Sequence, residues 1–186
     1  FYCHRSHVIY RERLKAVEPH LEGEEEFFAN YSDGLCDAHL PDIVDFHRSN
    51  NSIGTFMTVR PSQTFHVAEA DATGCVSSLL DVRETDTRIN GGYFVFNTRF
   101  FDYLMEGEDL VCEPFKRLIS EEKLFAYQHD GFWSCMDTYK EKQSLDAMYQ
   151  RGDMPWADLP KPQASTAVPP QTRASRISEP ANHSLK

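Results

Sequence analysis

Two aspartates stand where a carboxylate could bind a metal ion: Asp33 in "ANYSDGLCD" and Asp137 in "HDGFWSCMDTYKE". Asp33 follows the strand-like run "EFFANY", so we expect it at the carboxyl end of a strand, where open α/β sheets bind ligands. A carboxylate there can bind Mg²⁺, a hard ion that prefers oxygen. The alternative is that Asp33 and Gly34 only form a tight turn, because both residue types tolerate positive φ. Position alone leaves both interpretations open.

Asp137 also has a structural interpretation. Thr138 and Glu141 fit a helix capping box, and Asp137 would favour the positive end of that helix. The two interpretations are compatible, because a metal-binding aspartate can precede a helix. Two carboxylates about 4 Å apart repel by about 4 kcal/mol at an effective dielectric constant of 20. If Asp33 and Asp137 converge, we therefore expect a cation between them.

A third feature is the run "INGGYF", with Asn90, Gly91 and Gly92 at the start of a predicted strand. Paired glycines let a ligand approach the backbone closely, and an asparagine side chain both donates and accepts hydrogen bonds, which suits sugar hydroxyls. The alternative is a loop followed by a β-bulge. Trp133 in "GFW" could stack on a sugar or a base, although a tryptophan more often anchors a core.

The bulk composition excludes several classes of protein. The 186-residue chain has a formal net charge of −10, which disfavours a broad nucleic-acid-binding surface. Its five cysteines include no CxxC pair, which argues against a disulfide framework or a zinc ribbon and favours a reducing compartment. No apolar run approaches the roughly 18 residues that a membrane span needs. We therefore expect a soluble, cytoplasmic protein that binds neither nucleic acid nor membrane, with its oligomeric state open, a homo-oligomer included.

Strand-like and helix-like runs alternate along the chain, which predicts an α/β fold with a mostly parallel sheet covered by helices. Residues 1–12 read as an irregular segment and 13–159 as the folded domain. The tail 160–186 holds five of the ten prolines and no aromatic residue, so we expect it to be disordered. Strands are predicted at 26–31, 53–60, 64–71, 74–82, 92–96 and 123–133, with a hairpin turn at 72–74, and helices at 40–49, 98–105, 113–120 and 138–152.

The runs "FANYSDGL", "RINGGYFVF" and "AYQHDGFWSCMDTYKEKQSLDAMYQRGDMPW" occur in the order seen in glucose-1-phosphate cytidylyltransferases and related sugar-phosphate nucleotidyltransferases. The resemblance extends from about Arg13 to Trp156. It implies a Rossmann-like nucleotidyltransferase sheet flanked by helices. It also implies a reaction that joins a nucleoside triphosphate to a sugar 1-phosphate and releases pyrophosphate, with CTP and glucose 1-phosphate as the expected substrates.

The resemblance also implies roles for individual residues. Asp33 and Asp137 resemble the two Mg²⁺-binding aspartates of the family, and Ser32 stands where a nucleotide-contacting glycine is common. The run from Asn90 to Gly92 matches the motif that contacts the sugar. The resemblance therefore favours metal binding over a simple turn at Asp33.

Two departures accompany the match. The family begins with a glycine-rich segment that cradles the triphosphate, whereas this sequence resembles the C-terminal two-thirds and contains no GxGxxG or GxxxxGK motif. In addition, Leu80 to Val82 stand where many relatives carry Glu-Lys-Pro, so a lysine expected near the sugar phosphate is missing; Arg83 or Arg88 could replace it. The alternative function is a non-catalytic, truncated relative that binds sugar phosphate or pairs with a complete enzyme.

Overall fold

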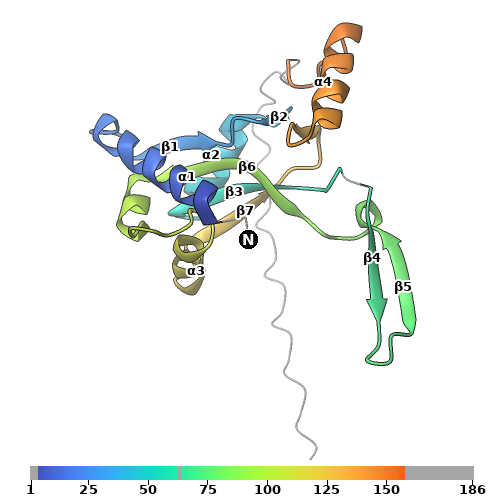
Figure 1. Ribbon diagram of the computed structural model, residues 1–186. Coiled ribbons are helices and arrows are strands. Elements are labelled where there is room, and N and C mark those ends of the chain that lie inside the picture. The colour runs from blue at the N-terminus through green and yellow to red at the C-terminus, as the bar shows by residue number, and fades with distance from the viewer. Residues whose placement is uncertain (1–3, 63, 158–186) are drawn as a thin grey trace, which may run out of the picture.

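The computed structural model describes residues 4–62 and 64–157 (Figure 1). The predicted disordered tail, 160–186, lies outside these residues. Residues 4–17 form a helix, whereas the sequence predicted an irregular segment up to residue 12. The helices are α1 (His4–Val17), α2 (Leu40–Ser49), α3 (Glu113–Ser120) and α4 (Tyr139–Arg151), with short 3₁₀ helices η1 (Glu18–His20), η2 (Val82–Glu84) and η3 (Thr98–Tyr103).

A four-stranded mixed sheet forms the centre of the molecule, in the order β1-β6-β3-β7. The α/β expectation is confirmed, but the expectation of a mostly parallel sheet is wrong. The β1–β6 and β6–β3 pairs are antiparallel, and the β3–β7 pair is parallel. The chain reverses between β3 and β6 through a hairpin instead of a helix, so β6 enters the sheet antiparallel to both neighbours. The strands are β1 (Glu26–Asn30), β6 (Ile89–Asn97), β3 (Gly54–Val59) and β7 (Leu124–Gln128).

Each face of the sheet is covered by its own apolar cluster. One face packs against α3 and η3 through a group of aromatic side chains in which Phe96 stacks on Phe100 with ring centroids 4.0 Å apart. The other face packs against α2 through Ile43 and Met57, both buried.

Residues 98–103 form a 3₁₀ helix, whereas the sequence predicts an α-helix over 98–105.

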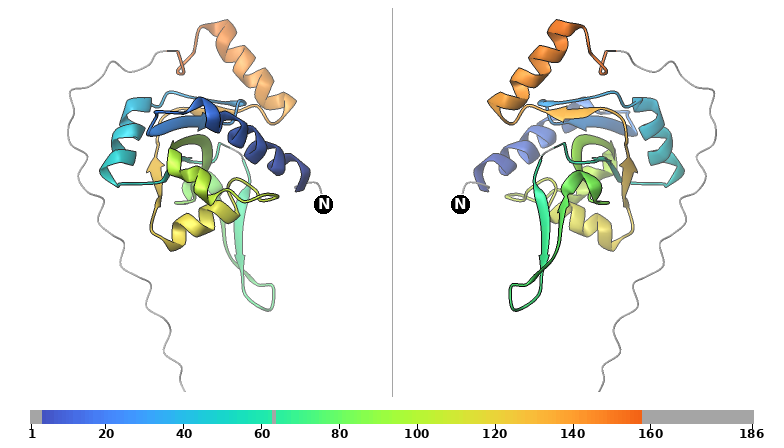
Figure 2. Two further views of the ribbon diagram at one scale, coloured as in Figure 1. Left: turned by 90° about the vertical axis from the view of Figure 1, so that its left-hand side faces the viewer. Right: turned by 90° about the vertical axis from the view of Figure 1, so that its right-hand side faces the viewer.

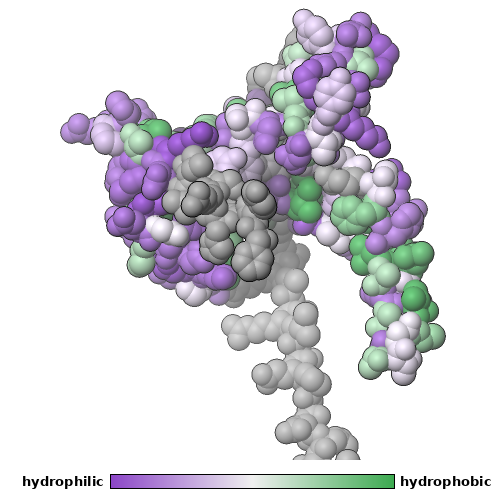
Figure 3. All heavy atoms as spheres, in the orientation of Figure 1, coloured by the Kyte–Doolittle hydropathy of each residue, from purple (hydrophilic) through white to green (hydrophobic). Residues whose placement is uncertain are grey.

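Two short antiparallel pairs extend from the sheet. β2 (Gly34–Cys36) pairs with β8 (Trp133–Cys135), and α4 follows β8 along the chain. β4 (His66–Ala70) and β5 (Val76–Asp81) form the predicted hairpin, which projects from the rest of the molecule as an arm (Figure 2). Apolar side chains gather along this arm (Figure 3), where Val76 is 60% exposed and Leu79 63% exposed.

Among residues 4–62 and 64–157, no helix has the length and apolar character needed to cross a membrane.

Candidate functional site

The predicted site residues come from one end of the central sheet. β1 and β3 are each antiparallel to β6, and β7 is parallel to β3, so the carboxyl ends of β1, β3 and β7 lie at the same end of the sheet. β6 begins at that end with Ile89. The segment that follows β1 contains Asp33, and the start of β6 contains Asn90. The topology thus places both segments where open α/β sheets bind ligands.

The β2–β8 pair brings the two predicted metal-binding aspartates to one end of a ribbon. Gly34 pairs with Cys135, and the backbone N–H of Met136 donates to the carbonyl oxygen of Asp33 over 2.9 Å. Asp33 directly precedes β2, and Asp137 follows β8 by two residues. Although 104 positions separate them in the sequence (137 − 33), the fold makes their backbones neighbours. Metal binding by the two carboxylates stays a prediction.

The glycines of "INGGYF" are tied to both flanking segments. The indole N–H of Trp133 donates to the carbonyl oxygen of Gly91 over 2.8 Å. The backbone N–H of Tyr31 donates to the carbonyl oxygen of Gly92 over 2.8 Å, which holds the chain next to Ser32 against β6. The side-chain oxygen of Asn90 accepts from the N–H of Gly92 over 2.9 Å. These bonds gather the predicted sugar-contacting run around the segment that carries Asp33.

Gly92 is required by this local geometry. Its φ is +76°, and a Cβ at this position would lie 2.7 Å from Cδ2 of Tyr31. The register of β3 with β6 also shifts between Phe56 and Thr58, beside the glycines, which is compatible with the loop and β-bulge that the sequence offered as the alternative. A bulge commonly reorients side chains next to a binding site, so its presence is compatible with sugar contact. Sugar contact by Asn90, Gly91 and Gly92 stays a prediction.

Trp133 acts as an anchor in this structure. Its ring is partly buried and packs against the apolar cluster under α2, and its N–H is bonded to Gly91. Stacking of Trp133 on a sugar or a base stays a prediction. The hydroxyl of Tyr93 donates to the carbonyl oxygen of Gly34 over 2.8 Å, which fixes β2 to β6.

Potential ligand atoms of Cys135, Asp137 and Glu141 all lie within 4.8 Å of one another. Burial, followed by the hydrogen bond to Asp137, raises the pKa of the Cys135 thiol to about 11, so sulfur is protonated near neutral pH. The carboxylate of Glu141 accepts from the backbone N–H of Thr138 over 2.8 Å, which confirms the predicted capping box. The oxygens of Asp137 and Glu141 suit a hard cation, and the thiol does not.

Glu141 is a candidate ligand that the sequence suggested only as a cap. The available signal was its position one helical turn after Asp137. A second pair was missed altogether: Nε2 of His129 lies 2.8 Å from Oδ1 of Asp37, the residue after β2. A Cβ on Gly131 would lie 2.3 Å from that carboxylate oxygen, so the glycine of "DGFW" makes room for this pair.

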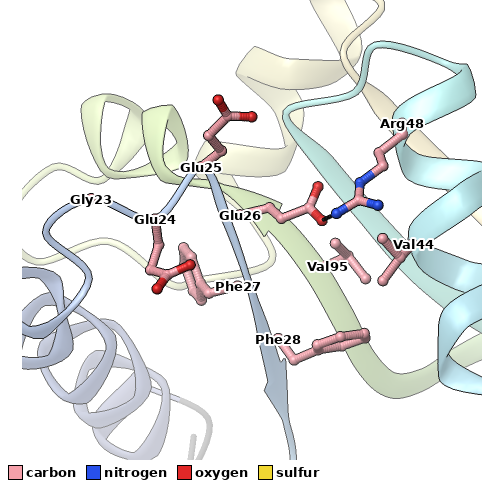
Figure 4. A pocket seen from close by; sticks show the side chains of 9 residues that line it. All are labelled: Gly23, Glu24, Glu25, Glu26, Phe27, Phe28, Val44, Arg48 and Val95. Atoms are coloured by element: carbon pink, nitrogen blue, oxygen red, sulfur yellow. Dashed lines mark hydrogen bonds and ion pairs between the residues drawn. The ribbon is translucent and has the colours of Figure 1, made fainter.

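An open cavity of about 470 Å³ lies at the beginning of β1, away from the predicted residues (Figure 4). Arg48 forms an ion pair with Glu26 in this cavity, and Phe28 is 50% exposed there. The cavity lies beside β1, which is an edge strand of the central sheet. None of the predicted metal-binding or sugar-contacting residues lines it; the lining residues are Gly23, Glu24, Glu25, Glu26, Phe27, Phe28, Val44, Arg48 and Val95.

Comparison with known proteins gives the following relatives. The chain is 32% identical over 146 residues to a glucose-1-phosphate cytidylyltransferase of Salmonella typhi, which covers 77% of this chain and 56% of the relative. It is 28% identical over 130 residues to a mannose-1-phosphate guanylyltransferase catalytic subunit beta of Drosophila pseudoobscura pseudoobscura, with 67% and 34% covered. No protein-family model matches the chain.

The structure resembles that of a putative glucose-1-phosphate thymidylyltransferase from Bacillus anthracis, with a TM-score of 0.54 and 13% sequence identity. That match covers 82% of this chain and 63% of the solved chain, and it concerns the fold alone. The chain thus spans about half the length of the cytidylyltransferase to which it is similar.

Proposed function

Because the chain belongs to the sugar-phosphate nucleotidyltransferase family, we propose that it carries the metal-binding and sugar-binding part of an enzyme that makes a nucleotide sugar. The reaction joins a nucleoside triphosphate to a sugar 1-phosphate and releases pyrophosphate. We propose CTP and glucose 1-phosphate as the substrates because the Salmonella typhi relative is named for them. The supporting observation is the backbone bond from Met136 to Asp33, which places both predicted aspartates at one end of the β2–β8 ribbon.

The donor atoms at this end of the ribbon suit Mg²⁺. Asp33 and Asp137 would hold the ion. Among the described residues, the ligand atoms that lie within 4.8 Å of one another belong to Cys135, Asp137 and Glu141, and Asp33 is not in that group. When bound, Mg²⁺ would offset the negative charge of the substrate phosphates and help to keep them in register. Burial, followed by the hydrogen bond to Asp137, raises the pKa of the Cys135 thiol to about 11, so the carboxylates and not the thiol would bind the ion.

The remaining residues would position the sugar phosphate. Asn90 is held by the N–H of Gly92, and Gly92 has no side chain that could block an approaching sugar ring. An oxygen of the sugar phosphate would attack the α-phosphorus of the nucleoside triphosphate in line, forming one P–O bond while the bond to pyrophosphate breaks. No covalent bond to the protein is needed, and the raised pKa of Cys135 makes its thiol a poor nucleophile.

Pyrophosphate release from CTP and glucose 1-phosphate in the presence of Mg²⁺ tests this function. The assay should use the chain and any longer natural protein that contains it, with GTP, dTTP and mannose 1-phosphate as alternative substrates. We expect release that falls at least 100-fold in Asp33→Asn and Asp137→Asn. Absence of release with every pair of substrates, in a protein that melts cooperatively, would contradict the proposal.

A second candidate function is sugar-phosphate binding without catalysis, alone or in association with a complete relative. The observation that favours it is that these 186 residues contain no GxGxxG or GxxxxGK motif that would cradle a triphosphate. Calorimetry separates the two functions: binding of glucose 1-phosphate without measurable binding of CTP favours the second, and comparable binding of both favours the first.

A further inference from the structure

Two arginines occupy opposite positions on the neighbouring strands β3 and β6, at the end of the sheet that carries the predicted site. Val59 of β3 pairs with Ile89 of β6 as the last pair of the ladder, so Arg60 and Arg88 occupy the next position on the two strands. Like charges directly opposite each other in an antiparallel pair are destabilising unless an anion lies between them. The arrangement therefore calls for a negative group at this point.

Asp130 supplies one negative charge to the two arginines. Its Oδ1 accepts from Nη2 of Arg88 over 2.6 Å and lies 3.5 Å from Nε of Arg60. The hydrogen bond from Arg88 holds the pKa of the Asp130 carboxyl below its usual range, so this carboxyl is ionised near neutral pH. One carboxylate between two guanidinium groups leaves a net charge of +1, and the Asp130 side chain is 68% exposed. The two arginines can therefore bind a second anion, and this position is accessible to solvent.

Both guanidinium groups are also held in place by backbone carbonyls. Nη1 of Arg60 donates to the carbonyl oxygen of Thr85 over 3.1 Å, and Nη1 of Arg88 donates to that of His129 over 3.3 Å. The Arg88 side chain is 16% exposed, so little of it can move freely. Pre-positioned guanidinium groups lose little conformational entropy when they bind a phosphate and can bond it through paired N–H groups.

Arg83, the arginine of η2, already binds a carboxylate of its own. Its Nε donates to Oδ1 of Asp81 over 2.8 Å, and Nη2 donates to Oδ2 of the same carboxylate. This bidentate ion pair neutralises the charge of Arg83. Arg88, by contrast, shares its carboxylate with Arg60, and it stands two residues before Asn90.

We propose that Arg60 and Arg88 together bind the phosphate group of the sugar 1-phosphate. This inference rests on the proposed function and adds the residues that recognise the phosphate. The free sugar is uncharged, whereas a phosphate dianion is attracted by the net charge of +1 that the two arginines and Asp130 leave. The arginine pair therefore favours a phosphorylated sugar over the free sugar.

Calorimetric titration of the 186-residue chain with glucose 1-phosphate, inorganic phosphate and glucose tests the proposal without requiring turnover. Arg88→Met and Arg60→Met should each weaken glucose 1-phosphate and inorganic phosphate binding about tenfold or more, because each removes a charge-assisted contact. Binding of glucose should stay unchanged. Arg83→Met is the matched control, since it removes a nearby arginine of the same charge, and it should bind like the wild type.

The outcomes separate this inference from the function on which it rests. If Arg88→Met and Arg60→Met melt cooperatively and bind glucose 1-phosphate as tightly as the wild type, the arginine pair is not the phosphate site, while sugar-phosphate binding stands. If Arg83→Met weakens binding as much as Arg88→Met, the effect is one of net charge and the inference is overturned. If the wild type binds no sugar phosphate, both the inference and the proposed function fail.

Discussion

The N–H of Met136 donates to the carbonyl oxygen of Asp33 over 2.9 Å, and this bond closes the β2–β8 ribbon at the end where the two predicted metal-binding aspartates lie. The ribbon is only three residues long on each strand. Its position depends on the bonds from Trp133 to Gly91 and from Tyr93 to Gly34, which attach it to β6. The candidate site is therefore held by the central sheet through β6.

Substitution of Gly92 should loosen the site. Gly92→Ala adds a Cβ 2.7 Å from Tyr31 at a φ of +76°, so both strain and a clash follow. We expect a loss of about 2–3 kcal/mol in the free energy of unfolding, measured by urea denaturation.

Gly23→Ala is the control for the strain alone. Gly23 has a φ of +90° but no atom within 4 Å of an added Cβ, so it should lose about 1 kcal/mol. Equal losses in the two variants would mean that the close approach of Tyr31 to Gly92 does not contribute to the free energy of unfolding.

Stability should fall in mild acid because of His47. This side chain is buried, its Nδ1 lies 2.9 Å from Oγ1 of Thr55, and burial lowers its pKa below the ordinary value of 6.5. The unfolded chain then binds more protons, so the contribution of His47 is complete above about pH 6.5 and is lost as the pH falls through the folded-state pKa.

The free energy of unfolding of wild type and His47→Gln, measured from pH 8 to pH 5, isolates this contribution. We expect the difference between the two proteins to shrink as the pH falls below about 6.5. A constant difference over this range would show that His47 does not control the acid sensitivity.

The arm and the core should respond very differently to truncation. Phe96 is fully buried and stacks on Phe100, so Phe96→Ala should cost about 3–5 kcal/mol in the free energy of unfolding. Leu79 on the β4–β5 arm is 63% exposed, so Leu79→Ala should change stability by no more than about 0.5 kcal/mol. A large loss in Leu79→Ala would mean that the arm packs against something in solution.

The elements that the sequence predicted well have strong local signals. α2 has Pro41 in its first turn, and α4 has the Thr138–Glu141 capping box and Gly152 in the left-handed conformation after its last turn. The arm was predicted from its turn, where Asp71 accepts from the N–H of Thr73 over 2.8 Å. In each case a few neighbouring residues determine the backbone.

Other features depend on contacts that are distant in the sequence. Strand direction was wrong because the hairpin from β4 to β5 returns the chain antiparallel to β3, which alternating runs do not reveal. Residues 98–103 form a 3₁₀ helix because Phe100 and Phe101 are both buried directly after the strand, and Asn97 caps the turn by accepting from the N–H of Arg99. The opposition of Arg60 and Arg88 follows from the register of β3 with β6, which periodicity cannot supply.

The most direct test of the metal site is Mn²⁺ binding followed by electron paramagnetic resonance, with Mn²⁺ in place of Mg²⁺ and with CTP and glucose 1-phosphate present. Asp33→Asn and Asp137→Asn should each weaken Mn²⁺ binding at least tenfold. Asp45→Asn, which alters an exposed aspartate of α2, should bind like the wild type. If both Asp33→Asn and Asp137→Asn bind Mn²⁺ as tightly as the wild type, the two aspartates do not share a cation and the proposed metal site is contradicted.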